Sequence, residues 1–217
     1  MTASSQTTTI HLVRHGQTLL NTTPIRFRGR RDVPLNRTGR KQATAAGLKL
    51  ASEGISIVYS SPLGRAFEVG TAIATGSRLD DVVPLDDLVN LDYGRWEGLT
   101  NEESEAVDPA AWKAYKTDPR AAHCPGGESV IAAEDRVVRA LTTIGERHPG
   151  ETVAAVSHGV MLRLAVLGTV GQVTADWSFP ISTGGSLVFE VTDGVVTFAS
   201  KLDGDIRTDE ALAGVSS

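Results

Sequence analysis

This chain of 217 residues is short of cysteine and contains only Cys124. One cysteine cannot form an internal disulfide, so nothing requires an oxidising compartment, and a zinc site built from several cysteines is excluded. No run approaches the roughly 20 apolar residues that a membrane span needs. The first nine residues lack both a basic start and an apolar stretch, which argues against a signal peptide. We therefore expect a cytoplasmic protein.

Positive charge is in the minority along the chain. The sequence holds 21 Lys and Arg residues against 26 Asp and Glu residues, so its formal net charge is −5. This balance argues against general binding to nucleic acids or to anionic membranes. Hydrophobic residues make up 41% of the chain and charged residues 22%, which suits a folded protein with a buried core. We expect one domain over residues 1–217, with 1–8 and about 208–217 flexible.

Apolar runs of strand type alternate with stretches of helical periodicity. Strands are predicted at 9–13, 55–59, 82–85 and 152–156. Helices are predicted at about 38–52, 61–75, 128–148 and 159–167, with short helices within 100–118. Residues 186–191 and 195–202, joined by Thr192-Asp193-Gly194, predict a C-terminal β-hairpin. The alternation predicts an α/β fold, a three-layer sandwich with a mostly parallel central sheet flanked by helices.

Several local signals predict where helices begin. Ser61 before Pro62 is typical of a helix start, with the serine as the N-cap, and Thr100 and Asp108 give similar signals. Residues 86–98 are predicted to be a polar connection, within a lid-like connection that spans 86–127.

Two histidines and two arginines occupy comparable places in the predicted fold. His15 and His158 each follow the end of a strand, Arg14 precedes the first histidine, and Arg65 lies near the start of the helix after 55–59. Ligands of open α/β sheets bind beyond the carboxyl ends of the strands, so we expect these four residues to meet in one crevice. Guanidinium groups and a helix N-terminus suit a dianionic phosphoryl group, and neutral imidazole is a competent nucleophile toward phosphorus.

Each of these residues also has a simpler interpretation when it is taken alone. A histidine at a strand end is commonly a hydrogen-bonded structural residue, and Arg65 alone fits a surface or capping role. His123 beside Cys124 is too small a set to predict a metal site. The aromatic residues Trp96, Trp112, Tyr93 and Tyr115 either wall the substrate entrance or pack the connection against the body.

A basic stretch runs through an otherwise acidic chain. This stretch either draws a phosphorylated substrate toward the site or forms a solvated loop and helix face. For Arg26 and Arg28 the solvated face is the weaker of these two explanations. Its members are Arg26, Arg28, Arg30, Arg31, Arg37, Arg40 and Lys41.

Ordered motifs along nearly the whole chain resemble those of the histidine phosphatase superfamily, the phosphoglycerate mutase-like group. The segments are Arg14-His-Gly-Gln-Thr-Leu-Leu-Asn21, Arg26-Phe-Arg-Gly29, Ser60-Ser-Pro-Leu-Gly-Arg-Ala66, Asp92-Tyr-Gly-Arg-Trp-Glu-Gly98 and Val156-Ser-His-Gly159. The resemblance implies a phosphoglycerate mutase-like fold. It also implies a metal-independent phosphatase, without a cofactor, that hydrolyses a small phosphorylated metabolite through a phosphohistidine intermediate.

The resemblance also implies roles for individual residues. His15 is implied as the nucleophile, and Arg14, Arg65 and His158 as the groups that hold the phosphoryl oxygens. Asn21 is implied to reach the phosphate, and Thr18 and Arg26 to face the substrate, with the amide of Gly159 as a further donor.

Asn90 is the departure that matters most for function. Members of the family usually carry a carboxylic acid four residues before the glycine that corresponds to Gly94, and an amide there cannot transfer a proton. Loss of a general acid typically costs about 10²–10⁴-fold in rate. A nearby carboxylate could substitute, the substrate could have a good leaving group, the acid could have been changed to its amide to trap a ligand, or turnover could be lost. The nearby carboxylates are those of Asp86, Asp87, Asp92 and Glu97.

The activity we expect is that of a phosphatase, with two alternatives. A phosphoglycerate mutase-type phosphotransferase is less favoured because the span between Gly98 and the helix near Glu128 leaves limited material to shield a phosphohistidine from water. A catalytically weakened phospho-ligand-binding protein is the alternative that Asn90 raises. A homodimer paired through the edge of the C-terminal hairpin is also compatible with the sequence.

Overall fold

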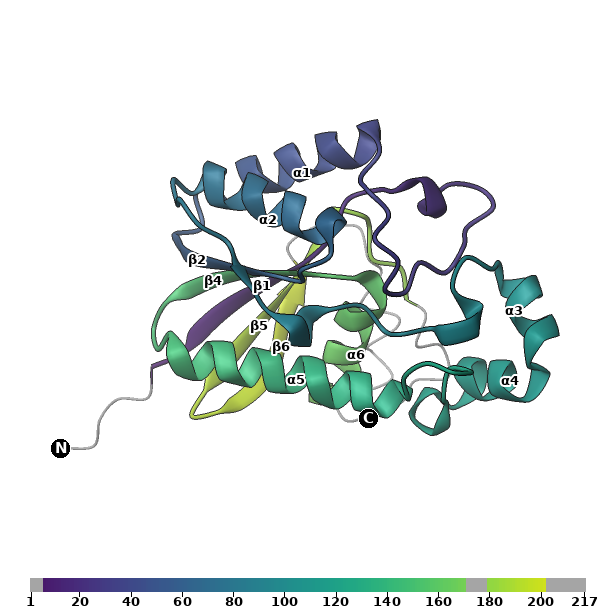
Figure 1. The fold of residues 1–217 in the computed structure, drawn as a ribbon. Helices are drawn as coiled ribbons and strands as arrows, with labels where there is room; N and C mark the ends of the chain where they lie inside the picture. The colour runs from purple at the N-terminus through teal and green to yellow at the C-terminus, as the bar shows by residue number, and fades with distance from the viewer. Residues whose placement is uncertain (1–5, 171–178, 202–217) are drawn as a thin grey trace.

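The computed structural model describes residues 6–170 and 179–201 (Figure 1). The ends are predicted to be flexible, and of those residues only 6–8 belong to the described part. Leu202 of the predicted hairpin also lies outside it. The strands are β1 (Thr8–Arg14), β2 (Ile55–Ser60), β3 (Val83–Pro84), β4 (Thr152–Ser157), β5 (Ser186–Thr192) and β6 (Val195–Lys201). The helices are α1 (Arg37–Leu50), α2 (Gly64–Gly76), α3 (Asn101–Val107), α4 (Pro109–Thr117), α5 (Val130–Arg147) and α6 (Gly159–Val170).

The strands form one sheet in the order β3-β2-β4-β1-β5-β6. The first four of these run parallel, and β5 and β6 join as an antiparallel hairpin beside β1. Helices α1 and α2 cover one face of the sheet, and α5 and α6 cover the other (Figure 1). The predicted three-layer α/β architecture with its C-terminal hairpin is therefore confirmed.

Both faces of the central strands are buried, which explains their continuous apolar runs. On one face Val13, Val58 and Val156 pack with α1 and α2, and on the other Leu12 and Val153 join the larger cluster beneath α5 and α6. Parallel strands covered on both faces are expected to be apolar throughout. The arrangement brings the carboxyl ends of β1, β2 and β4 to one edge, where Arg14 and Ser157 are in register.

The predicted helix starts are confirmed in two places and wrong in one. The Thr100 hydroxyl caps α3 by accepting from the Glu103 amide, and the Asp108 carboxylate caps α4. Ser61 does not cap α2, which begins at Gly64 after an uncapped Leu63. The Gly64 amide donates instead to the Asp32 carboxylate at 2.9 Å, and the Ser61 hydroxyl lies 2.9 Å from the His158 Nε2 atom.

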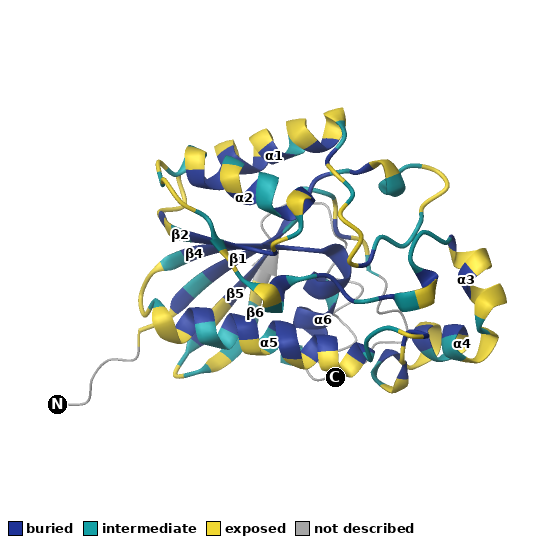
Figure 2. Ribbon diagram, in the orientation of Figure 1, coloured by how far each residue is buried: buried dark blue, intermediate teal, exposed yellow. Residues whose placement is uncertain are grey.

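The segment 86–98 is not the polar connection that its composition predicts. Leu88, Leu91 and Trp96 are fully buried in the larger core cluster, and Leu88 and Trp96 each end a short 3₁₀ turn. Figure 2 shows that the central strands are buried along most of their length. The apolar residues are spaced irregularly, so neither strand nor helix periodicity reveals their burial.

Candidate active site

His15 stands directly beyond the carboxyl end of β1, where its ring is held in one tautomer. The Nδ1 atom lies 2.6 Å from the Gly16 carbonyl oxygen, and only a protonated Nδ1 can donate to it. The Nε2 atom is therefore left with its lone pair, and it is buried without a hydrogen-bond partner. Gly16 permits the close approach of the first turn of α1, because a Cβ there would lie 2.5 Å from the Gly39 carbonyl oxygen.

His158 occupies the equivalent position beyond β4, the strand next to β1. The centroids of the His15 and His158 rings are 5.2 Å apart. The contact of its Nε2 atom with the Ser61 hydroxyl leaves its Nδ1 atom buried without a partner. When the serine donates to Nε2, the histidine carries its proton on Nδ1 and presents a donor there.

Two arginines complete this group, each anchored by backbone carbonyls. Arg65, fully buried in the first turn of α2, donates through Nη1 to Arg31 and through Nη2 to Gly29, at 2.6 and 2.8 Å. Arg14 donates through Nη1 to the Ile181 carbonyl. In both side chains the buried Nε atom has no partner, so each keeps an N–H group for a ligand.

A close approach at the start of α6 makes room for Arg14. A Cβ on Gly159 would lie 3.0 Å from the Arg14 Nε atom, tighter than nine in ten real Cβ contacts. Glycine at this position therefore lets the guanidinium lie directly against the helix N-terminus.

Arg28, which was not among the predicted site residues, belongs to the same group. Its Nε and Nη1 atoms are buried without partners, and it lines the cavity described below. The Arg26-Phe-Arg-Gly29 motif was the available signal, and the sequence set Arg26 and Arg28 apart from the rest of the basic stretch without assigning Arg28 to the site. Ser61 was expected to cap a helix and instead contacts His158.

The concentration of positive charge changes the acidity of the whole group. Burial, followed by the charges of Arg28 and Arg65, lowers the pKa of His15 well below its ordinary value. Burial and the charge of Arg65 do the same to the pKa of His158. Burial and the charge of Arg28 lower the pKa of Arg14 to about 9, so both histidines are neutral and Arg14 is charged at neutral pH.

A cavity of about 410 Å³ opens beside these residues. Of the predicted site residues it is lined by Arg14, Asn21, Arg26, Asn90, His158 and Gly159, and further by Gln17, Ile25, Phe27, Arg28, Tyr93, Asn101, Tyr115, Val160, Arg163 and Thr183. His15, Arg65 and Thr18 do not line it. The Thr18 hydroxyl donates to the Asn21 Oδ1 atom at 3.1 Å.

The aromatic residues divide between the two predicted roles. Tyr93 and Tyr115 line the cavity, with their hydroxyl oxygens 3.2 Å apart. Trp96 and Trp112 pack behind them, with ring centroids 5.6 Å apart. Burial raises the pKa of Tyr93 to about 12, so this phenol is a weak acid.

Asn90 is 3% exposed and turns its amide in a defined direction. Its Nδ2 atom donates to the Gly29 carbonyl oxygen at 3.0 Å, while its Oδ1 atom is buried without a partner. The side chain therefore offers an acceptor to a ligand. None of the four nearby carboxylates lines the cavity. Asp86 is exposed, and Asp87 pairs with Arg139. Asp92 accepts from the Gly94 amide, and Glu97 pairs with Arg31.

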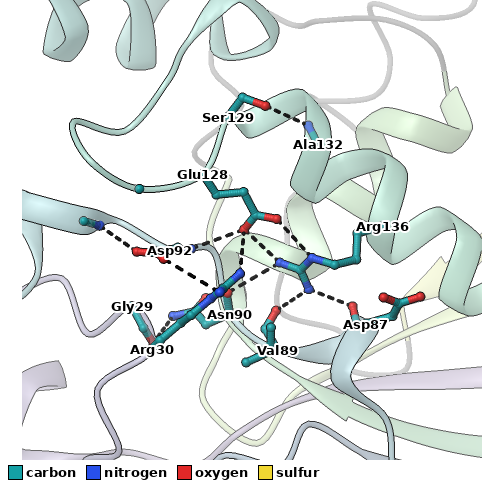
Figure 3. A network of polar contacts seen from close by, with 12 residues as sticks. Gly29, Arg30, Asp87, Val89, Asn90, Asp92, Glu128, Ser129, Ala132 and Arg136 are labelled. Carbon is teal, nitrogen blue, oxygen red and sulfur yellow. Dashed lines mark hydrogen bonds and ion pairs between the residues drawn. The ribbon is translucent and has the colours of Figure 1, made fainter.

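The backbone around Asn90 is held by a network of polar contacts (Figure 3). The Arg136 guanidinium donates to the carbonyls of Asp87 and Val89 at 2.9 and 2.8 Å and pairs with the Glu128 carboxylate at 3.0 Å. Glu128 also accepts from the amide of Asp92. The network fixes the backbone position from which the Asn90 side chain extends.

The structure thus brings Arg14, His15, Arg65 and His158 together at one end of the sheet, as the sequence predicts. Among the described residues there is no group of three His, Cys, Asp or Glu side chains that could hold a metal ion. Within the same part of the chain, no helix is both long and apolar enough to cross a bilayer. Fold and site together define an α/β protein with a buried group of arginine and histidine side chains beyond its parallel strands.

Comparison with known proteins identifies the family. The model of the histidine phosphatase superfamily (branch 1) matches residues 10–203, and the chain belongs to this superfamily. It is 32% identical over 170 residues to phosphoserine phosphatase 1 of Hydrogenobacter thermophilus, covering 77% of this chain and 79% of the relative. It is 36% identical over 165 residues to the metal-independent phosphoserine phosphatase of Arabidopsis thaliana, covering 75% and 69%. By class it is a phosphoric monoester hydrolase.

Solved structures agree with the predicted fold. YhfR of Bacillus stearothermophilus superimposes with a TM-score of 0.79 at 32% identity, over 89% of this chain and 96% of that one. A phosphoglycerate mutase of Bacillus anthracis superimposes with a TM-score of 0.77 at 24% identity, over 90% and 93%. The phosphoglycerate mutase-like fold is confirmed.

Proposed function

We propose that the protein is a metal-independent phosphatase that hydrolyses a small phosphorylated metabolite through a phosphohistidine at His15. The observation that carries the proposal is the bond from Nδ1 to the Gly16 carbonyl, which leaves the Nε2 lone pair free beside unpartnered arginine N–H groups. A lowered pKa keeps the imidazole neutral and therefore nucleophilic. Relatives named as phosphoserine phosphatases support a small phosphorylated substrate.

In the first step the His15 Nε2 lone pair attacks phosphorus, and the bond from phosphorus to the leaving oxygen breaks. Arg14 and Arg65 donate from Nε to non-bridging oxygens, and His158 donates from Nδ1. These donors face charge that spreads over the phosphoryl oxygens in the transition state, so removal of one costs about 10²–10³-fold in rate. In the second step water attacks the phosphohistidine and the N–P bond breaks, which restores neutral imidazole and releases dihydrogen phosphate.

The test is to trap the intermediate without metal. The protein is incubated with a reactive phosphoryl donor in the presence of a chelator, quenched, and analysed by peptide mass spectrometry. We expect the mass of one phosphoryl group on the peptide that contains His15, and none in His15→Gln. His123→Gln is the matched control, because His123 is an exposed histidine outside the cavity.

Asn90 supports a second candidate, a protein that binds a phosphorylated ligand without turnover, because an amide stands where the general acid is expected. Saturable binding of the phosphoryl donor with no modified His15 peptide would favour this candidate over the phosphatase.

A further inference from the structure

Arg28 differs from the neighbouring arginines in having no counter-charge. Arg26 pairs with Glu103 at 2.6 Å, Arg30 with Glu128 at 3.5 Å, and Arg31 with Glu97 at 3.8 Å. Over the described residues, no carboxylate pairs with Arg28, although its Nε and Nη1 atoms are buried. A buried cation without a partner is costly, so its position indicates that an anionic ligand completes it.

The cavity has more positive charge than one phosphoryl group can balance. Glu103 balances the charge of Arg26 in the lining, which leaves Arg14, Arg28 and Arg163, and Arg65 adds a fourth charge close enough to act on His15. Within the described chain no Asp or Glu lines this cavity. A phosphoryl dianion compensates two of these four charges, which leaves about two for the rest of the substrate. The volume of about 410 Å³ holds a ligand considerably larger than one phosphate.

Asn90, which stands where a general acid is expected to protonate the leaving group, is close to Arg28. Arg28 precedes Gly29, whose carbonyl accepts from the Asn90 amide. With its Nδ2 atom held there, Asn90 directs an acceptor oxygen toward a ligand and cannot supply a proton. A fixed guanidinium beside that position can stabilise negative charge on a departing oxygen without a proton.

We propose that Arg28, together with Arg163, binds the leaving group as an anion, and that the site is therefore suited to phosphoanhydrides, in which the departing group is itself a phosphate. This inference rests on the proposed phosphohistidine chemistry and names its substrate class. A phosphate leaves readily as an anion because it titrates near pH 6, about the value of a phosphoryl group. An alkoxide is a much poorer leaving group, because its conjugate acid is about as weak an acid as water.

The step balances without an added proton. The His15 Nε2 lone pair forms the N–P bond, the bond from the terminal phosphorus to the bridging oxygen breaks, and its electron pair stays on the departing phosphate. Arg28 receives that charge. Water then attacks the phosphohistidine, both of its protons remain on the released dihydrogen phosphate, and the electrons of the N–P bond return to Nε2.

The test compares four substrates in the presence of a chelator. Pyrophosphate has an acidic and anionic leaving group, 4-nitrophenyl phosphate an acidic one with less charge, 3-phosphoglycerate an alkyl one with a carboxylate, and glycerol phosphate an alkyl one without. We expect kcat/KM to be highest for pyrophosphate. Faster turnover of 3-phosphoglycerate or glycerol phosphate than of pyrophosphate would overturn the proposal.

Variants then show which part of the substrate Arg28 serves. In Arg28→Met we expect the ratio of kcat/KM for pyrophosphate to that for 4-nitrophenyl phosphate to fall by about tenfold or more, with partial recovery in Arg28→Lys. Arg31→Met is the matched control for this ratio, because the exposed Arg31 side chain pairs with Glu97 and does not line the cavity. An equal loss on all four substrates would mean that Arg28 holds the transferred phosphoryl group, and the proposal would be wrong.

A binding measurement covers the case in which turnover is slow. Imidodiphosphate, a non-hydrolysable analogue of pyrophosphate, should bind the wild type by calorimetry more tightly than inorganic phosphate does, and Arg28→Met should remove that difference. Equal affinity of the wild type for the two ligands would contradict the proposal. Absence of a phosphohistidine with every substrate would instead refute the proposed function.

Discussion

Replacement of Asn90 by Asp tests whether proton transfer is what this site lacks. General acids contribute about 10²–10⁴-fold in rate, or about 2.7–5.5 kcal/mol. The full amount is not expected here, because the atom that replaces Nδ2 would face the Gly29 carbonyl oxygen at 3.0 Å. Two acceptor oxygens at that distance repel each other, so the carboxyl stays protonated, and it acts as a general acid only while its proton is on the ligand-facing oxygen rather than on the one bonded to Gly29.

From this geometry we expect hydrolysis of glycerol phosphate by Asn90→Asp to rise by at least about tenfold, near the low end of general-acid effects. Hydrolysis of 4-nitrophenyl phosphate should change much less, because its leaving group needs no proton. Asn90→Glu carries the carboxyl one methylene farther into the cavity, where it is free of the Gly29 carbonyl, and should show an equal or larger gain.

The assay is kcat/KM for both substrates between pH 6 and pH 8, about the range around neutrality in which a tuned general acid operates. Asn90→Leu is the control, since it removes the bond to Gly29 without adding an acid, and should give no gain on either substrate. If neither the Asp nor the Glu variant gains on glycerol phosphate, or if both substrates gain equally, the reasoning is refuted.

Two further predictions concern stability. His15 and His158 have lowered pKa values in the folded state. Below about pH 6.5 the unfolded chain therefore takes up protons that the folded chain does not. Each histidine then lowers the free energy of unfolding by up to about 1.4 kcal/mol for each pH unit of acidification. Urea unfolding of His15→Gln should therefore show a shallower decline from pH 7 to pH 5.5, and a decline parallel to the wild type would contradict this. Arg136→Met should lose about 1–3 kcal/mol in urea at pH 7, because the carbonyls of Asp87 and Val89 lose their donor while Glu128 keeps only its longer pairing with Arg30; a loss below about 0.5 kcal/mol would show that the network contributes little.

The sequence predicts the residues that lie at strand ends better than any others. Residues that directly follow parallel strands must share one edge of the sheet, so Arg14, His15 and His158 could be brought together without knowing any side-chain contact. Arg65 follows by the same argument, because its helix begins just after β2.

Residues whose roles depend on packing could not be predicted in this way. Arg28 lies outside regular secondary structure, so neither strand nor helix periodicity indicates where its guanidinium turns. Ser61 next to proline looks like a cap, and only the approach of His158 explains why its hydroxyl is used elsewhere. The burial of Leu88 and Leu91 depends on the helices that cover them, which a short irregular segment does not reveal.

The network around Asn90 bears on how its amide should be understood. One guanidinium, that of Arg136, holds the carbonyls of Asp87 and Val89, so the backbone that presents position 90 is firmly built (Figure 3). These bonds hold backbone carbonyls and do not involve the Asn90 side chain, so they do not depend on whether an amide or an acid stands there. An amide at position 90 and an unpaired Arg28 both make the cavity more positive, since one withholds a negative charge and the other adds a positive one. Both features favour an anionic ligand, and the amide also disfavours proton transfer, so a substrate that needs charge stabilisation more than protonation is the one to which this site is best suited.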